Sequence, residues 1–198
     1  MTSISCRCGK VTLRLTSTSP RVSTECCCNS CFRRVQVLQQ MGGPPVNPAK
    51  PIVNLKWDNR VVVEQGKDSL MAYRLSPKTK VYNIASSCCH TFLLGRNSEY
   101  DANCLTTNQD SPIYDDHYVE IPPSSRWFSN QWTQGQKERL DPLVGIWVSE
   151  DGNLTGEEGW GSVFEEHKRA MDAPIAPNAK GETFDELIGS LDPPKIVT

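Results

Sequence analysis

The sequence shows no long hydrophobic run, and its first residues do not resemble a secretory leader. A membrane-spanning helix needs about 18 or more consecutive apolar residues, and no such run occurs among the 198 residues. The stretch from Met1 to Cys6 also lacks the basic and apolar segments of a signal peptide. We therefore expect a cytoplasmic protein with no membrane partner.

Clustered positive charge is also missing. Residues 1–129 hold 15 Lys and Arg against 10 Asp and Glu, a net charge of +5, whereas residues 130–198 hold 6 against 13, a net charge of −7. The basic residues of the first part are scattered, and nucleic-acid binding usually requires a basic patch. We expect no nucleic-acid partner, and the opposite net charges suggest that the two parts touch.

Cysteine is absent from the last 94 residues, although nine cysteines precede them. They occupy positions 6, 8, 26, 27, 28, 31, 88, 89 and 104. A disulfide framework needs an oxidising compartment, which the expected cytoplasmic location does not provide. Nine clustered cysteines in such a chain indicate metal binding instead.

The residue pattern predicts a mainly β front part. Period-two alternation, β-branched residues and intervening turn residues predict strands over 10–15, 60–64, 70–75, 80–84 and 112–121. Apolar residues recur every three positions over 31–41 and predict a helix. The glycines and prolines that follow end this helix and predict a loop up to Pro51.

The remainder predicts an extension with short elements. Trp127, Phe128 and Trp132 are too apolar for a free linker and should pack on the sheet. Residues 143–148 suggest a further strand, and residues 162–171 and 182–191 suggest short helices that end near proline.

Cys26, Cys28 and Cys31 form a C-x-C-x-x-C motif that a single turn can bring around one ion. Zinc–sulfur bonds are about 2.3 Å long, and soft thiolate ligands favour zinc. Structural zinc sites have four protein ligands, whereas catalytic sites keep one position for water or substrate. The motif therefore predicts an open zinc site, with the alternative that Cys104 or one of the three histidines closes it.

Cys6 and Cys8 predict half of a second site, because they form a C-x-C pair followed by Gly9. The glycine lets the backbone turn so that its N–H groups can face the sulfurs. Cys88 and Cys89 are the remaining candidates that lie close together. Side chains of adjacent residues tend to diverge, so the alternative is a pair of buried free thiols.

The order of these motifs resembles the glutathione-dependent formaldehyde-activating enzyme family, whose domain centromere protein V shares. The resemblance covers about residues 2–129 and rests on the C-x-C-G motif, on the C-x-C-x-x-C motif followed by Phe32-Arg33-Arg34, and on a third cysteine motif roughly 60 residues later. It implies a β-tent fold of small antiparallel sheets for this domain. The charge division predicts that residues 130–198 are an acidic extension that packs on the domain or trails from it.

The resemblance also implies two metal sites and a reaction. It implies a catalytic zinc at Cys26, Cys28 and Cys31, and a structural zinc at Cys6, Cys8 and the third motif. The implied activity is the addition of the glutathione thiol to formaldehyde, which gives S-hydroxymethylglutathione, or the reverse reaction.

The third motif departs from the family pattern C-x-x-C-G-T-x-L. Cys89 matches its second cysteine, His90 replaces the glycine, and Ser86 stands where the first cysteine belongs. Cys88 is a candidate to replace that ligand. The alternatives are a three-cysteine site completed by water or His90, and an empty site.

An open zinc with three thiolates has a formal charge of −1 and can hold a substrate thiol in its deprotonated form. Arg33 and Arg34 are candidates to bind the carboxylates of glutathione, with a solvated helix face as the alternative. His90 and His117 are candidates for proton transfer. Trp57, Trp127 and Trp132 could line a ligand pocket, although ordinary packing is the default for such residues.

Two classes of function remain. The first is a zinc-dependent carbon–sulfur lyase-type enzyme that forms or breaks a thiol adduct of a small molecule, with one or two zinc ions per chain and glutathione as co-substrate. The second is a non-catalytic, zinc-stabilised module that binds a protein partner. The sequence carries no signal for the oligomeric state.

Overall fold

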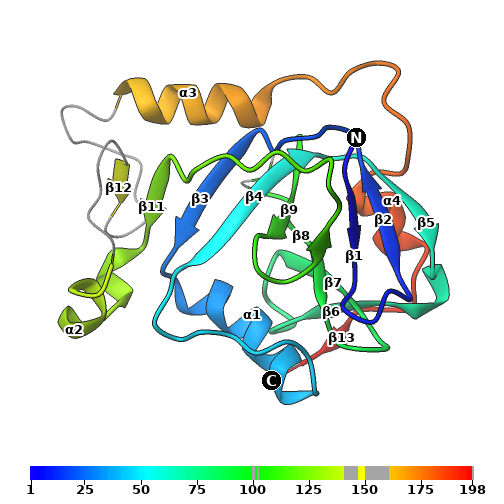
Figure 1. Cartoon of the computed structure of the whole chain (residues 1–198), viewed down its shortest axis with the longest axis horizontal. Coiled ribbons are helices and arrows are strands. Elements are labelled where there is room, and N and C mark those ends of the chain that lie inside the picture. Colours follow the sequence, from blue (N-terminus) through cyan, green and yellow to red (C-terminus); the bar gives the residue numbers. More distant parts are fainter. Residues whose placement is uncertain (100, 102, 141–146, 150–160, 198) are drawn as a thin grey trace.

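The computed structural model describes residues 1–99, 101, 103–140, 147–149 and 161–197, and in these ranges the chain is mainly β with short helices (Figure 1). The smaller sheet has the strand order β10-β1-β2-β5. Its strands are Ile113–Tyr114 (β10), Ser3–Ser5 (β1), Thr12–Leu15 (β2) and Val61–Gln65 (β5). Every pairing in this sheet is antiparallel.

The larger sheet has the strand order β12-β11-β3-β4-β9-β8-β7-β6-β13. Its strands are Trp147–Ser149 (β12), Ser125–Trp127 (β11), Val22–Cys26 (β3), Ile52–Asp58 (β4), Cys104–Asn108 (β9), Phe92–Asn97 (β8), Val81–Ser86 (β7), Leu70–Arg74 (β6) and Lys195–Ile196 (β13). The pairings β11–β12, β11–β3 and β13–β6 are parallel, and the others are antiparallel.

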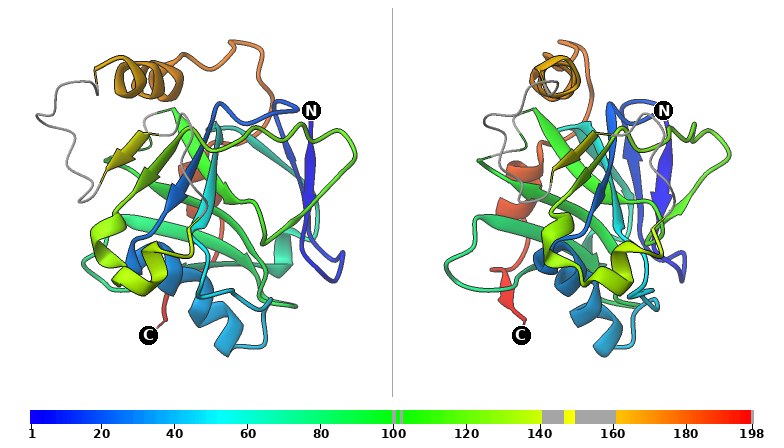
Figure 2. Two further views of the ribbon diagram at one scale, coloured as in Figure 1. Left: turned by 60° about the vertical axis from the view of Figure 1, so that its left-hand side comes forward. Right: turned by 90° about the vertical axis from the view of Figure 1, so that its left-hand side faces the viewer.

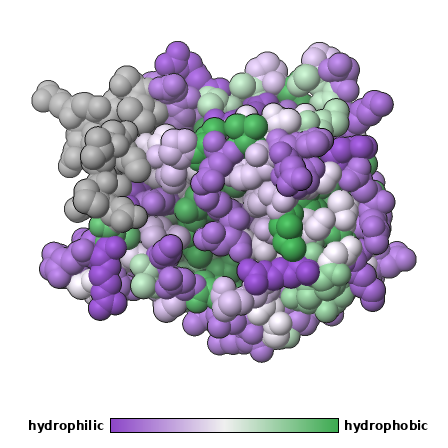
Figure 3. Space-filling view, in the orientation of Figure 1, coloured by the Kyte–Doolittle hydropathy of each residue, from purple (hydrophilic) through white to green (hydrophobic). Residues whose placement is uncertain are grey.

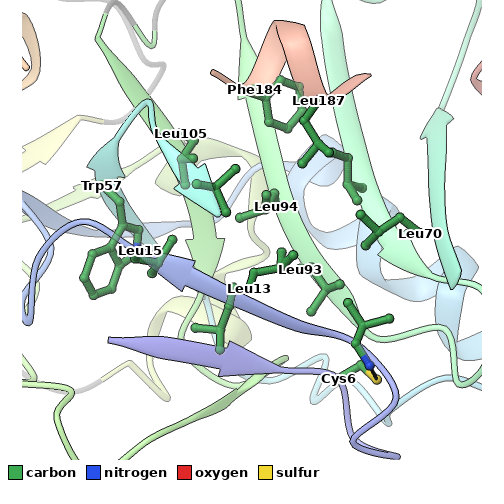
Figure 4. Packing of buried hydrophobic residues seen from close by; sticks show 14 of the residues in the cluster. Cys6, Leu13, Leu15, Trp57, Leu70, Leu93, Leu94, Leu105, Phe184 and Leu187 are labelled. Atoms are coloured by element: carbon green, nitrogen blue, oxygen red, sulfur yellow. Dashed lines mark hydrogen bonds between the residues drawn. The ribbon is translucent and has the colours of Figure 1, made fainter. Parts of the chain in front are cut away.

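The main hydrophobic core lies between the two sheets (Figure 4). Leu13 and Leu15 of β2 point toward Leu93 and Leu94 of β8, and all four side chains are buried. Trp57 closes one end of this core, where its indole Nε1 donates to Thr107 at 2.9 Å. Each sheet covers the apolar face of the other, so both sheets are needed to bury these faces.

Helix α1 (Asn29–Gln40) forms a second core with the larger sheet. Its Val35 and Leu38 pack with buried residues of β6 and β8, among them Tyr73 and Phe92. The helix ends at Gln40 with Met41 as its C-cap, and Gly42 then adopts a positive φ of 98° that suits glycine. The predicted helix over 31–41 is confirmed, with its start two residues earlier.

The strands predicted over 10–15, 60–64, 70–75 and 80–84 are confirmed as β2, β5, β6 and β7. The strand predicted over 112–121 is wrong for most of its length, because only Ile113–Tyr114 pairs with β1. Asp115 ends it: its carboxylate accepts from the N–H of Ser3 at 2.8 Å, and its carbonyl accepts from the N–H of Tyr118 at 3.1 Å.

In the C-terminal region, the two predicted helices are confirmed as α3 (Gly161–Asp172) and α4 (Phe184–Gly189). Of the strand predicted over 143–148, residues 143–146 lie outside the described ranges, and Trp147 and Val148 belong to β12. Shorter elements are the 3-10 helices η1 (Lys67–Ser69) and η2 (Ser129–Gln131) and the helix α2 (Gln134–Lys137). None of the described helices is long and apolar enough to cross a membrane.

Helix α4 is part of the main core. Phe184 and Leu187 are buried and enter the core beside β8 (Figure 4), and the N–H of Phe184 donates to the Asn59 side chain at 2.7 Å. Acidic residues of this region pair with basic residues of the front part, in the ion pairs Arg60–Glu186, Lys67–Glu182 and Arg96–Asp185. The division of the chain between residues 129 and 130 stays a prediction.

Helix α3 lies across the end of the larger sheet (Figure 2). Arg21 binds the C-terminal end of this helix. The guanidinium of Arg21 donates to the carbonyls of Ala170 and Ala173, at 3.1 and 2.7 Å, and contacts the Asp58 carboxylate at 2.5 Å. Carbonyl groups in the last turn of a helix have no partner within the helix, and a cation there also interacts well with the helix dipole.

We expect Arg21→Ala to destabilise the protein by about 2 kcal/mol, because it removes charged hydrogen bonds to half-buried carbonyls and to Asp58. Urea unfolding measures the change, and limited proteolysis should show faster cleavage within α3. The control is Arg169→Ala, which removes an exposed arginine of α3 that donates to the carbonyl of Glu165 in the same helix at 3.1 Å. Equal destabilisation by the two substitutions would contradict the role of Arg21.

A second prediction concerns His167, which is buried on α3 beside the Trp127 ring with 5.6 Å between the ring centroids. Burial lowers the pKa of His167 from 6.5 to about 4, and the charge of Lys56 adds to the effect. The unfolded chain therefore takes up this proton at a higher pH than the folded chain, so the free energy of unfolding should fall as the pH drops from 6.5 to 4. His167→Phe should reduce that slope in urea unfolding measured across this pH range. An unchanged slope would contradict the prediction.

Candidate metal centres

The first candidate metal centre lies where β3 runs into α1 (Figure 1). Cys26 is the last residue of β3, Cys28 caps the N-terminus of α1, and Cys31 lies in its first turn. The Cys28 sulfur accepts from the N–H of Cys31 at 3.2 Å, so a cysteine takes the place of the usual Ser, Thr, Asp or Asn cap. The Cys26 and Cys28 sulfurs are 3.3 Å apart, and all three sulfurs lie within 4.8 Å of one another.

These distances fit a common metal ion. Two sulfurs bound to one tetrahedral zinc at about 2.3 Å each would lie about 3.8 Å apart, within the range that the three thiols span. Among the described residues, no further His, Cys, Asp or Glu side chain joins this group. The three cysteines could therefore hold a metal ion and leave one ligand position to a molecule from outside.

The thiol pKa values indicate that the negative charge of the three-cysteine group lies on Cys31. Hydrogen bonds from the Cys26 and Cys28 thiols hold the pKa of Cys31 well below its ordinary value, although burial opposes this. The pKa of Cys26 is raised by its hydrogen bonds to Cys28 and Cys31. A hydrogen bond from Cys26 lowers the pKa of Cys28, but the bond to Cys31 and burial raise it to about 12. A divalent cation would replace these shared protons.

A chain of polar contacts supports the sulfur of Cys31. The Asn54 side-chain nitrogen donates to this sulfur at 3.6 Å, and its oxygen accepts from the Arg34 guanidinium. Arg34 also donates to the Asn108 side-chain oxygen at 2.6 Å and lies over the Phe92 ring. Such contacts orient metal ligands and tune their charge.

The second candidate centre brings together Cys6, Cys8, Cys88 and Cys89, whose sulfurs lie within 4.8 Å of one another. The Cys8–Cys88 sulfur distance is 3.2 Å, and the Cys6–Cys8 distance is 3.5 Å. The N–H of Val11 donates to the Cys6 sulfur at 3.3 Å, after a turn in which Gly9 has a φ of 74°. This group could hold a metal ion with four ligands.

The turn around Cys88 and Cys89 explains how adjacent cysteines converge. His90 adopts a left-handed φ of 49°, which is rare for residues other than glycine. Ser86 is buried, and its hydroxyl lies 3.3 Å from the Cys89 sulfur. Burial raises the pKa of Cys88 to about 12. Burial also acts on Cys89, but hydrogen bonds from Ser86 and Thr91 outweigh it and lower the pKa of Cys89 to about 6.

Other candidate residues lie away from the first centre or play a packing role. Cys27 is buried, and burial raises its pKa to about 11. Cys104 packs with Val22 and Met171 instead of joining Cys26, Cys28 and Cys31. Trp57 belongs to the main core.

The two candidate arginines have different surroundings, and so do the two histidines predicted for proton transfer. Arg34 is buried beside Cys31, whereas Arg33 is exposed. His117 is exposed, and His90 lines a cavity of about 280 Å³ under the loop that follows α1. Trp132 lines a cavity of about 180 Å³ on the Cys26 and Cys27 side of the first centre.

A third cavity, of about 240 Å³, opens on the Cys28 and Cys31 side of the first centre. Its lining includes three basic residues, one acidic residue and three amides: Arg34, Lys56, Arg96, Asp101, Asn54, Asn83 and Asn97. Of these residues, the sequence analysis named only Arg34. The rest come from strands β4, β7 and β8 and from the segment between β8 and β9, and no spacing in the sequence links them.

Comparison with known proteins adds no family. No family model matches the chain, and no curated protein matches it. A crystal structure of a Rhodobacter sphaeroides protein from structural genomics is similar over 55% of this chain and 84% of that chain, with 15% identity and a TM-score of 0.38.

The geometry predicts two bound divalent ions per chain. We expect Cys28→Ser to lose one of the two, and Cys8→Ser to lose the other, because each removes a ligand from one group. Elemental analysis after purification measures the metal content, and a strong chelator should lower the melting temperature of the wild-type protein. Cys27→Ser and Cys104→Ser are matched controls that should keep both ions. Equal metal loss in a control and in Cys28→Ser would contradict the assignment.

Proposed function

We propose that the protein is a zinc-dependent carbon–sulfur lyase-type enzyme that forms or breaks a thiol adduct of a small aldehyde. The observation that carries the proposal is the group Cys26, Cys28 and Cys31, which no fourth His, Cys, Asp or Glu side chain joins in the described part of the chain. This function is also the one that the resemblance to the glutathione-dependent formaldehyde-activating family implies, with glutathione and formaldehyde as the first substrates to test.

Zinc is the proposed metal because three thiolates form a soft ligand set. A zinc ion held by Cys26, Cys28 and Cys31 would supply a Lewis-acidic position that favours the deprotonated form of a substrate thiol. The Arg34 side chain lies next to this group and offsets part of its negative charge. Asn54 holds the Cys31 sulfur in place by its hydrogen bond at 3.6 Å.

The proposed reaction needs no oxidant or reductant. In the forward direction, the thiol sulfur forms a bond to the aldehyde carbon, and the π electrons of the carbonyl move to oxygen. The proton released by the thiol goes to that oxygen, and the reverse reaction returns it to sulfur. Neither His90 nor His117 lines the cavity beside Cys31, so the proposal assigns them no role in proton transfer.

The second group is proposed as a structural zinc site. Cys6 and Cys8 follow β1, whereas Cys88 and Cys89 lie between β7 and β8, so one ion would join the smaller sheet to the larger. Metal binding by residues so distant in sequence contributes directly to the folding free energy.

The test is the rate at which glutathione and formaldehyde interconvert with S-hydroxymethylglutathione, followed by NMR exchange spectroscopy. We expect the zinc-loaded protein to raise this rate above the rate in buffer, and Cys28→Ser to lower the protein-dependent part at least about tenfold. Cys27→Ser, which changes a neighbouring cysteine outside the group, should retain the wild-type rate.

Two results would contradict the proposal. Equal rates for the wild type and Cys28→Ser would exclude formaldehyde activation at this site. An X-ray absorption spectrum with four protein ligands on every bound zinc would favour the non-catalytic interaction module.

A further inference from the structure

We propose that the 240 Å³ cavity beside Cys28 and Cys31 binds the carboxylate of a small thiol substrate, and that Arg34 and Asn83 recognise it. This inference rests on the proposed function, because it places the substrate of the three-cysteine group. Beyond that function, it specifies a thiol with a carboxylate as the substrate class and Arg34 and Asn83 as the residues that bind the carboxylate.

Lys56, Asn83 and Thr106 line the cavity and lie in one row across the larger sheet, with Gly95 between Asn83 and Thr106. Asn83 of β7 pairs with Gly95 of β8, Gly95 with Thr106 of β9, and Thr106 with Lys56 of β4. Cross-strand partners share one face of a sheet, so these four residues lie side by side. The N-terminal part of α1 covers this face with Cys31 and Arg34.

Gly95 leaves space in this row of residues. A Cβ atom at this position would lie 3.1 Å from the Asn83 side-chain oxygen and 3.5 Å from an Arg34 guanidinium nitrogen. The missing side chain therefore lets Arg34 and Asn83 approach the same point of the sheet, where both face the cavity.

The three basic residues of the wall differ in their partners. Lys56 contacts the buried Asp101 carboxylate, and Arg96 pairs with the exposed Asp185 at 2.9 Å. Arg34 is buried and, within the described residues, forms no ion pair with a carboxylate. Its Nε also lacks a hydrogen-bond partner there. An arginine in this state is suited to an incoming carboxylate.

The surroundings of the Asn83 side chain also indicate a ligand in the cavity. It is fully buried, yet neither its side-chain nitrogen nor its oxygen has a hydrogen-bond partner in the described part of the chain. Buried polar groups are rarely left without partners, and a ligand in the cavity would satisfy both atoms. The nitrogen can donate to a carboxylate, and the oxygen can accept from a ligand N–H or from water.

The cavity volume limits the size of the ligand. About 240 Å³ corresponds to about eight water molecules at roughly 30 Å³ each. A three-carbon thiol acid fits such a space with its sulfur at Cys31, whereas drug-sized ligands usually occupy about 300–1,000 Å³. A larger thiol would place only its thiol end in the cavity.

The experiment compares 3-mercaptopropionate with its methyl ester, which has the same thiol and no charge. Both are titrated into the Co²⁺-loaded protein, and the thiolate-to-cobalt absorption band reports binding at the three-cysteine group. We expect the acid to bind about tenfold more tightly than the ester, because a charged hydrogen bond is lost in the ester.

Two variants test the assigned place of the carboxylate, one at Asn83 itself and one at Gly95, whose missing side chain leaves room for Arg34 and Asn83. Asn83→Leu and Gly95→Ala should each bring the acid-to-ester ratio toward one, while the ester binds as it does to the wild type. Two substitutions keep the test decisive if one of them fails to fold. Asn47→Leu is the control, because it makes the same change at an exposed residue that lines the cavity under the loop after α1.

The outcomes separate the two proposals. Equal binding of acid and ester would overturn carboxylate recognition but leave the open metal position intact. A preference for the acid that survives in both variants would mean that the carboxylate binds elsewhere, on the cobalt ion for example, and would also overturn it. If neither thiol changes the cobalt spectrum, the open site itself is wrong and both proposals fail.

Discussion

The buried positive charge of Arg34 is the constraint on which the candidate site depends. A guanidinium in the protein interior is costly unless a negative charge or several hydrogen bonds compensate it. Within the described residues, Arg34 has the Asn54 and Asn108 amides and the Phe92 ring, but no carboxylate. The charge of Arg34 helps to lower the pKa of the Cys31 thiol, so a Cys31 thiolate would offset part of that charge. The cysteine group and the arginine therefore stabilise each other, and both require that α1 begins where β3 ends.

The two cysteine groups have different structural settings. Cys26, Cys28 and Cys31 come from one continuous strand–helix junction, so the chain brings them together locally. Cys6, Cys8, Cys88 and Cys89 come from distant parts of the chain and meet only when the two sheets pack together. The local group is supported by hydrogen bonds from the N-terminal turn of a helix, whereas the second group depends on strained backbone at His90. A metal at the second group would thus act mainly on stability, and one at the first mainly on chemistry.

The sequence predicted the parts of the structure that have local signals. The strands around Leu13, Val62 and Tyr73 alternate or carry β-branched residues, and the helix over 31–41 has regular apolar spacing. Strands β3 and β9 were not predicted, because they read VSTEC and CLTTN and bury Ser, Thr and Asn on both faces. The cysteine motifs gave the members of both groups. Asn83 and Lys56 could not be found in this way, because only strand pairing brings them to one face.

The contact between the basic front part and the acidic C-terminal region was expected from net charge, but charge is not what holds α4 in place. Exposed ion pairs contribute about 0–1 kcal/mol each, and Glu186 and Asp185 are mostly exposed. Burial of Phe184 and Leu187 in the main core contributes more, at about 1.5–3 kcal/mol for a large apolar side chain. The Arg96–Asp185 pair matters for another reason. It holds one basic residue of the cavity wall from outside the cavity, and among the described residues Arg34 is then the wall cation without a carboxylate partner.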